Sequence, residues 1–320
     1  MRRYAVDPPR STGVPSTCRA SLSARPTTAY GRPVRASGVL DEHSPLVGAD
    51  HLCWVYDDPS SFVHAALRYL AEGVAHGERL LCIGDGLDDE LRAAGEPFGS
   101  IDELVAEGML SFQSVGDTYV DGGPVSPADQ WAFYDAAVRA ARAAGYRGLR
   151  VVAEITALAR SASGRAGLVA WEHLADEYIA SGSGMVAMCA YDRGALDAEA
   201  VADVTAVHPQ VHAPLDPPSF RIWFDGSHVA IAGTVDTFGA ARLARVLAAS
   251  PVTGPTAVLD LSGLEVVDVG GCRTLAAWAR SLADRGIRLR VQGAPRAVVR
   301  IWRLLGMDGP APVTFAGAVG

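Results

Sequence analysis

The stretch Leu259 to Arg280, LDLSGLEVVDVGGCRTLAAWAR, predicts a strand, a loop and a helix, with one acid and two glycines at the junction. The apolar run 258–261 is typical of a buried strand. Asp268 then precedes Gly270-Gly271 and is suited to capping the first turn of the helix. From Cys272 onward, apolar and small residues recur three and four positions apart, which places them on one helix face. That face is expected to pack against a sheet.

The flanking sequence extends this unit in both directions. Residues 220–233, FRIWFDGSHVAIAG, form two alternating apolar runs joined by Asp225-Gly226, a dipeptide that favours a two-residue hairpin turn. A helix is expected over 238–249, a strand over 288–291, and a further helix after Pro295. The predicted order is β-β-α-β-α-β-α, an α/β domain that continues to the end of the chain.

This order, together with the Asp268 loop, resembles the STAS domains of the anti-sigma factor antagonist family, whose loop normally reads Asp-Ser-Ser-Gly. The resemblance covers residues 220–320, where the loop reads Asp268-Val269-Gly270-Gly271. In the family, a partner kinase that is also an anti-sigma factor phosphorylates the second serine, and the matching position here is Gly270. Glycine has no hydroxyl, so the charge of about −1.5 to −2 that a phosphate adds cannot be placed there. The resemblance therefore implies constitutive partner binding, or control from elsewhere in the chain.

We expect a partner-binding face on this domain, and two of its residues have simpler alternatives. Asp268 is explained equally well by helix capping alone. Trp278 lies about 100° from the centre of the apolar stripe, so it is either a half-exposed anchor for a partner or packs under a neighbouring loop. The predicted face consists of Asp236, Thr237, Asp268, Gly270, Gly271 and Trp278.

Composition limits the chemistry of the chain. The 320 residues carry a formal charge of −8, and all 28 basic residues are arginine, so lysine-dependent catalysis is excluded. The acidic balance disfavours direct binding to nucleic acid or to anionic membranes. No apolar run approaches the roughly 18 residues of a membrane span, and no apolar segment follows Arg2-Arg3. We therefore expect a cytoplasmic protein.

The cysteines and histidines show no metal-binding motif in their spacing. Five cysteines form an odd set without a Cys-x-x-Cys pair, and the eight histidines are dispersed. Cys53, Cys82 and Cys189 each lie in an apolar run and are read as small core residues. The spacing predicts no metal and no cofactor.

The chain divides into four segments. Residues 1–47 hold seven arginines against three acids, without periodicity, and are expected to form a disordered tail. Residues 48–213 alternate strands with helices, among them a strand over 51–56 and helices over 87–94 and 166–180, which predicts βαβ units and a mainly parallel sheet. A proline-rich linker over 214–219 joins this unit to the domain at 220–320.

The unit at 48–213 resembles the core of RecA- and KaiC-like ATPases, but it lacks their phosphate loop. The connection from Tyr56 to Ser61 contains Asp57 and Asp58 and has neither glycine nor lysine. A carboxylate about 5 Å from a phosphate costs about 3 kcal/mol per charge pair at an effective dielectric near 20. We therefore expect no ATP hydrolysis and no enzymatic activity.

A closer resemblance is to the MEDS domain, the methanogen/methylotroph sensory module, which has this core without a working phosphate loop. What the resemblance implies is sensing of a small molecule or another input. The residues that carry it are His51 and Tyr56, Gly148-Leu149-Arg150 leading to Glu154, Trp171-Glu172, Cys189-x-Tyr191-Asp192 and His208-Pro209.

Five polar residues in or at the ends of predicted strands suggest a ligand pocket at the carboxyl edge of this sheet. Polar residues at strand ends also commonly act as caps or as hydrogen-bond partners, and that alternative stays open. The candidates are His51, Tyr56, Glu154, Tyr191 and Asp192.

Together these patterns favour a non-catalytic regulator that acts as an anti-sigma factor antagonist. Its STAS domain would bind a histidine-kinase-like anti-sigma factor, and the sensory domain, with a small-molecule effector, would gate that encounter. We expect such a regulator to be a monomer or a homodimer. The alternatives are a scaffold subunit of a larger STAS signalling complex and a degenerate nucleotide-binding enzyme.

Overall fold

The computed structural model describes most of the chain beyond residue 36. The predicted tail, apart from a few residues between 37 and 46, lies outside the described part, as does Cys18. The described residues are 37–42, 44, 46, 50–95, 99–119, 125–225, 227–250, 252–307 and 313–316.

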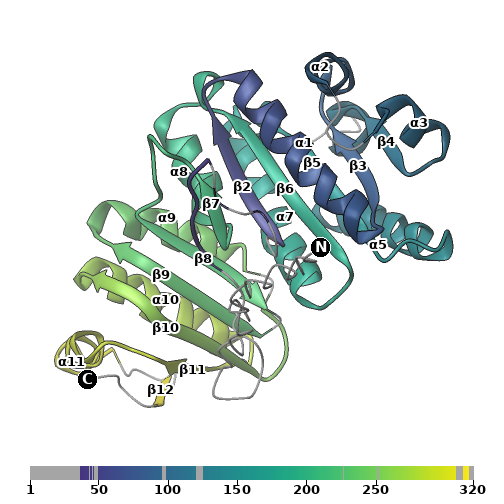
Figure 1. Ribbon diagram of the computed structural model, residues 1–320. Helices are drawn as coiled ribbons and strands as arrows, with labels where there is room; N and C mark the ends of the chain where they lie inside the picture. The colour runs from purple at the N-terminus through teal and green to yellow at the C-terminus, as the bar shows by residue number, and fades with distance from the viewer. Residues whose placement is uncertain are drawn as a thin grey trace, which may run out of the picture. The chain divides into compact units, whose positions relative to one another are not determined.

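The first sheet has seven parallel strands in the order β1-β7-β2-β6-β5-β3-β4 (Figure 1), which confirms the predicted parallel α/β fold. Its strands are β1 (Gly38–Val39), β2 (His51–Tyr56), β3 (Arg79–Ile83), β4 (Leu110–Gln113), β5 (Leu149–Glu154), β6 (Met185–Asp192) and β7 (Gln210–His212). The connecting helices are α1 (Pro59–His76), α2 (Leu87–Ala94), α3 (Ile101–Ala106), α4 (Val115–Tyr119), α5 (Pro127–Ala143), α6 (Thr156–Ala159), α7 (Ala162–Ala180), the 3-10 turn η1 (Arg193–Ala195) and α8 (Ala198–Ala206).

Two apolar layers cover the two faces of this sheet, as strand alternation requires. Leu52, Trp54 and Tyr56 of β2 pack in one cluster with α1. Cys53 and Val55 of the same strand pack in the other cluster, with residues of α5 and α7. Helices on both faces make the sheet a buried central layer, which is typical of parallel sheets.

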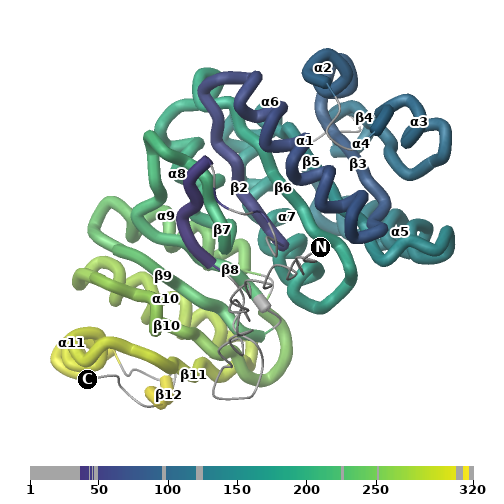
Figure 2. Tube along the Cα trace, viewed as in Figure 1, coloured from purple at the N-terminus to yellow at the C-terminus, as the bar shows by residue number. Residues whose placement is uncertain are grey.

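The second sheet has five strands in the order β12-β11-β10-β9-β8, traced in the lower part of Figure 2. Only β8 and β9 are antiparallel, as the hairpin pattern predicts, and the other described pairs are parallel. The strands are β8 (Phe220–Asp225), β9 (His228–Val235), β10 (Thr256–Val267), β11 (Arg288–Gln292) and β12 (Val313–Ala316). The helices are α9 (Thr237–Ala248), α10 (Val269–Asp284) and α11 (Arg296–Leu304).

Strand β8 lies at the edge of the second sheet and is covered by the first domain. Phe220, Ile222 and Phe224 of β8 share one apolar cluster with Val169 of α7 and Val207, which follows α8. An uncovered edge strand exposes backbone donors and acceptors, so this packing also protects the sheet from unwanted pairing. The two domains therefore meet along α7 and β8.

Candidate functional site

A cluster of ionisable side chains lies inside the first domain, against the face of the sheet that α7 covers. Residues four apart on a helix and two apart on a strand share a face, which explains how α7 and β6 each contribute a pair. All six side chains are buried. They are His51 of β2, Glu172 and Asp176 of α7, Cys189 and Tyr191 of β6, and His208, which follows α8.

The His51 ring is held between two carboxylates. Its Nδ1 lies 3.0 Å from Asp176 Oδ1, and its Nε2 lies 3.1 Å from Glu172 Oε2. Burial alone would lower the pKa of His51, but these two hydrogen bonds raise it to about 9. The ring is therefore a buried cation at neutral pH, with both nitrogens donating.

Glu172 is the centre of the cluster. The Tyr191 hydroxyl donates to its Oε1 at 3.0 Å, and the Cys189 thiol lies 3.6 Å from its Oε2. His208 Nε2 lies 3.5 Å from the same Oε2. Burial opposes ionisation of Glu172, yet the adjacent His208 and His51 lower its pKa well below the usual range. The carboxylate is thus charged although it is fully buried.

Asp176 connects this cluster to the second domain. While Oδ1 accepts from His51, Oδ2 accepts the backbone N–H of Phe224 in β8 at 2.5 Å. The ring of His173, one residue after Glu172, packs on the Phe224 ring with centroids 4.3 Å apart. Burial lowers the pKa of His173 to about 4, so this ring is neutral at pH 7. One carboxylate therefore joins the core of the first domain to the edge strand of the second sheet.

The structure divides the five predicted pocket residues between the two faces of the sheet, which corrects the expectation of one shared pocket. His51 and Tyr191 belong to the cluster around Glu172. Tyr56 lies on the other face and donates to Glu154 Oε1 at 3.1 Å. The Thr156 hydroxyl donates to Glu154 and accepts the backbone N–H of Asp192. The reason is strand alternation: positions 51 and 56 are an odd number apart, so they face opposite ways.

Tyr56, Glu154 and Asp192 do lie together at the carboxyl edge of the sheet, where the sequence placed all five. Burial raises the pKa of Glu154, although its bonds from Thr156 and Tyr56 act in the opposite direction. Nearby, Asp58 accepts from the backbone of Ser60 and Ser61 and so caps α1. Whether this edge binds a ligand stays a prediction.

Sequence reasoning assigned His51 and Tyr191 to a site but not the other four residues of the buried cluster. Cys189 was read as a small core residue, Glu172 and His208 were named for the family resemblance, and Asp176 was not singled out. The available signal was on α7, where Glu172 and Asp176 are four apart on a face otherwise made of Ala175, Ile179 and similar apolar residues. Two acids on the buried face of a helix need partners inside the fold.

In the second domain the N-termini of α9 and α10 lie side by side. The Asp236 side chain accepts the Gly239 N–H at 2.8 Å and caps α9. Asp268 accepts the Gly271 N–H at 2.8 Å and caps α10, as the sequence predicts. The Thr237 hydroxyl donates to Asp268 Oδ2 at 2.5 Å and joins the two caps. Four of the predicted face residues, Asp236, Thr237, Asp268 and Gly270, are thereby brought together.

Gly271 and Trp278 lie beneath this surface. A Cβ at Gly271 would stand 2.5 Å from Val267 Cγ2, so the position is fully packed. Trp278 is only 5% exposed, so of the two alternatives the structure favours a packed side chain over a half-exposed anchor. Helix α9 packs beside α10 and covers Trp278, on a side of α10 that lies outside the apolar stripe seen in the sequence. The sequence pattern therefore did not predict that this side is buried.

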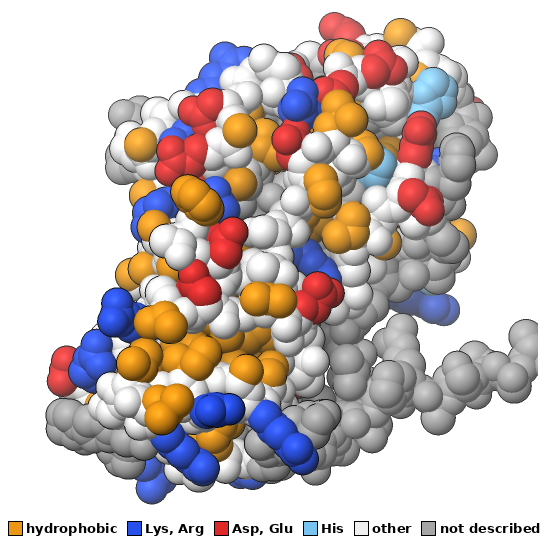
Figure 3. All heavy atoms as spheres, turned by 90° about the vertical axis from the view of Figure 1, so that its left-hand side faces the viewer, with side chains coloured by type: hydrophobic (Ala, Val, Ile, Leu, Met, Phe, Trp, Pro, Cys, Tyr) orange, Lys and Arg blue, Asp and Glu red, His pale blue; other side chains and the backbone are white. Residues whose placement is uncertain are grey.

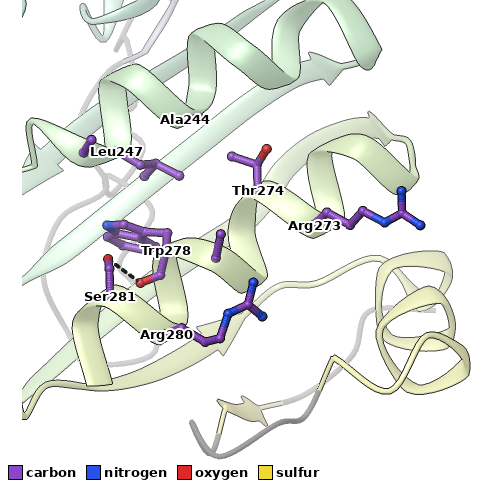
Figure 4. Close-up of a pocket in the computed structure, with 9 residues that line it drawn as sticks. Ala244, Leu247, Arg273, Thr274, Trp278, Arg280 and Ser281 are labelled. Atoms are coloured by element: carbon purple, nitrogen blue, oxygen red, sulfur yellow. Dashed lines mark hydrogen bonds between the residues drawn. The ribbon is translucent and has the colours of Figure 1, made fainter. Parts of the chain in front are cut away.

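A groove of about 510 Å³ runs between α9 and α10, with Trp278 in its wall (Figure 4). Ala244 and Leu247 of α9 lie opposite the indole, and the side chains of Arg273 and Arg280 point outward at the rim. In the space-filling view of Figure 3, hydrophobic side chains gather in the lower half of the molecule, and basic side chains lie around them. The surface combines apolar area with positive charge.

The chain matches two family models, and no curated protein matches it. None of the described helices has the length and apolar character that crossing a bilayer requires. Residues 219–315 match a STAS model described as Mlab, STAS domain, which indicates a signalling role of the anti-sigma factor antagonist type. Residues 50–209 match the model described as MEthanogen/methylotroph, DcmR Sensory domain. The chain therefore belongs to the MEDS family, and its sensory domain is followed by a STAS domain.

Proposed function

We propose that this chain is a non-catalytic signalling regulator whose STAS domain binds a histidine-kinase-like anti-sigma factor. The observation that carries the proposal is the Thr237–Asp268 hydrogen bond, which joins two helix N-termini into one surface. Phe238, next to Thr237, is 90% exposed, and Val269, next to Asp268, is 40% exposed. Exposed apolar side chains gathered beside polar groups are typical of protein-binding surfaces.

Charge favours an acidic partner surface. Residues 220–320 hold eleven arginines and seven acidic residues, while the whole chain is acidic at −8. Arg273 and Arg280 stand at the rim of the groove beside the proposed face. Opposite charge on the partner would speed the encounter and set its orientation.

Control would come from the sensory domain. Gly270 offers no hydroxyl where a phosphorylated serine stands in related domains, so phosphorylation at that position is excluded. The Asp176–Phe224 contact supplies a physical connection between the sensory core and the STAS sheet. An effector that binds two arrangements of this contact with different affinity would shift the population of binding-competent molecules.

Affinity capture with the full-length chain tests the proposal. We expect a histidine-kinase-like anti-sigma factor to be enriched by the wild type and lost with Phe238→Asp, because a charge replaces the apolar contact. Leu304→Asp is the matched control, since Leu304 of α11 is 73% exposed but lies outside the proposed face. Equal capture by all three proteins, or capture of no such partner, would refute the proposed face.

Phosphorylation gives a second readout. Incubation with the captured kinase and ATP should leave the wild type unmodified and should add one phosphate to Gly270→Ser. A Cβ at Gly270 stands 3.1 Å from Asp268 Oδ1 and meets no backbone of another element, so the serine can be accommodated. Modified Gly270→Ser should bind the partner at least about tenfold more weakly, since the phosphate adds charge to the docking surface.

A further inference from the structure

We propose that His51, Glu172, Cys189 and His208 bind one divalent transition-metal ion, of which Zn²⁺ fits best. The four potential ligand atoms lie within 4.8 Å of one another, and all four residues are buried. This inference concerns the sensory domain alone and does not depend on partner binding by the STAS domain.

The distances fit a tetrahedral site. The Glu172 Oε2 atom lies 3.1 Å from His51 Nε2, 3.5 Å from His208 Nε2 and 3.6 Å from Cys189 Sγ. Cys189 Sγ lies 3.9 Å from His51 Nε2. Zinc bonds of about 2.0–2.3 Å at tetrahedral angles place neighbouring ligand atoms about 3.3–3.8 Å apart. These four distances are within a few tenths of an ångström of that range, and the longest separation in the set, up to 4.8 Å, would have to shorten by about 1 Å when the ion binds.

An outer layer of hydrogen bonds already orients three of the four ligands. His51 bonds through Nδ1 to Asp176, which leaves Nε2 directed at the cluster. The Glu172 Oε1 atom accepts from Tyr191, which leaves Oε2 for the ion. His208 donates from Nδ1 to the Val204 carbonyl oxygen at 2.8 Å. Metal-binding histidines usually have such a second partner on the far nitrogen, because it fixes the ring and its tautomer.

His208 supplies the independent sign of a missing ligand. Its Nδ1 donates to the Val204 carbonyl oxygen, which turns Nε2 toward Glu172. That Nε2 atom is fully buried, points at Glu172 and has no hydrogen-bond partner among the described residues. A buried nitrogen and a buried carboxylate oxygen that lie 3.5 Å apart without a hydrogen bond are poorly satisfied, and a metal cation between them would bind both.

The donor set selects the class of metal. Two imidazoles, one thiolate and one carboxylate are borderline ligands, which suit Zn²⁺ or Co²⁺ and do not suit the all-oxygen preference of Mg²⁺ or Ca²⁺. On binding, the Cys189 thiol and the His51 ring would each release a proton to solvent. The charge of the ion would then be balanced by the Glu172 carboxylate and the Cys189 thiolate. Four protein ligands leave no open position, as in structural zinc sites.

Metal analysis of the full-length chain, purified without a histidine tag or chelator, tests the site. We expect about one zinc ion per chain, as purified or after refolding with Zn²⁺. Refolding with Co²⁺ should give the visible bands of a tetrahedral ion and a thiolate-to-cobalt charge-transfer band. A folded wild-type chain that holds less than about a tenth of an ion under both conditions overturns the proposal.

Two cysteine variants locate the site. Cys189→Ala should lose the charge-transfer band and lower zinc affinity at least about tenfold. Cys53→Ala is the matched control, because Cys53 is buried and pairs in register with Cys189 on the neighbouring strand but is not one of the four ligands. Circular dichroism checks that each variant folds. If Cys189→Ala does not fold, the wild-type cobalt spectrum decides, since a tetrahedral ion without a thiolate band contradicts the assigned ligands.

Discussion

The two domains of this chain use their interiors in opposite ways. The core of the STAS domain is apolar, and among the described residues only Ser250 is a buried polar side chain there. The sensory domain buries two acids and three histidines around one point, together with other polar groups. Both are α/β domains with parallel strands, so the fold alone does not require this difference.

The difference indicates which domain can respond to an input. An apolar core is insensitive to charge and holds the STAS surface in one shape. A buried ionic network costs several kcal/mol per ion to desolvate and is stable only while every partner is present, so a proton, a metal or a ligand changes its energy strongly. Asp176 belongs to the network and also bonds to β8, so the gating that we propose would pass through this residue.

Removing one charge from the network should have the largest effect. Glu172→Gln keeps the shape of the side chain but leaves the buried His51 cation with one carboxylate, and we expect a loss of about 3–5 kcal/mol in the free energy of unfolding. Chemical denaturation of the full-length chain, followed by circular dichroism with a chelator present, measures this loss. Leu275→Met in the STAS core is also close to isosteric and should cost less than about 1.5 kcal/mol. Equal losses would erase the contrast between the two interiors.

The contact between the domains should give the next largest effect. Asp176→Leu also takes one carboxylate from His51, so its total cost includes the loss of a network charge; the part that comes from removing this acceptor of the Phe224 N–H is about 1–3 kcal/mol. Hydrogen exchange of the Phe224 amide should therefore accelerate. Arg245→Gln breaks a half-exposed ion pair between the domains, with Asp203, and should cost less than about 1 kcal/mol. If Phe224 exchanges at the same rate in both variants, Asp176 does not join the domains.

Most of the fold was predictable because most of its helices and strands are long enough for the spacing of their apolar residues to be recognised. The strand His51–Tyr56 and the helix Leu87–Ala94 have the expected bounds. The helix expected from Ala166 begins at Ala162, because the Ser161 side chain caps a first turn that carries no apolar stripe. The strands β1, β7 and β12 have two to four residues, too few for alternation to identify them.

The candidate sites were less predictable, because they depend on how elements pack. Positions 51, 172, 189 and 208 come from different elements, and no sequence spacing connects them. The α9–α10 contact that buries Trp278 is likewise a tertiary feature. Helix caps are local, and there the sequence was sufficient, since Asp268 caps α10 as predicted.

Two adjacent glycines of the STAS domain, Gly270 and Gly271, should respond differently to substitution by alanine, because only Gly271 is closely packed against apolar side chains. Gly271→Ala pushes a Cβ to within 2.5 Å of Val267 Cγ2 and 3.0 Å of Val235 Cγ1, so we expect a loss of about 1–3 kcal/mol. Gly270→Ala meets only the Asp268 side chain, at 3.1 Å from Oδ1, which must give by a few tenths of an ångström, and alanine is the better helix former, so we expect a change of less than about 1 kcal/mol. Denaturation of the two variants measures both changes. Equal costs would mean that helix formation, not packing, limits this junction.

The smallest effect concerns the sensory domain's other face, where hydroxyl groups of the described residues Tyr56 and Thr156 bond to Glu154. The folded protein raises the pKa of Glu154, chiefly through burial, whereas it lowers that of Glu172. A raised pKa means that the wild type loses stability as pH rises from the unfolded value of 4.5 through the folded value. Glu154→Gln cannot ionise and keeps an oxygen for Tyr56, so it should be more stable than the wild type at pH 7 and equal to it below pH 4.5. Denaturation of both proteins at several pH values measures this difference in the free energy of unfolding, with Glu107→Gln, at an exposed position, as the control. If the stability difference between Glu154→Gln and the wild type instead grew as the pH fell, Glu154 would be stabilised as a carboxylate, like Glu172.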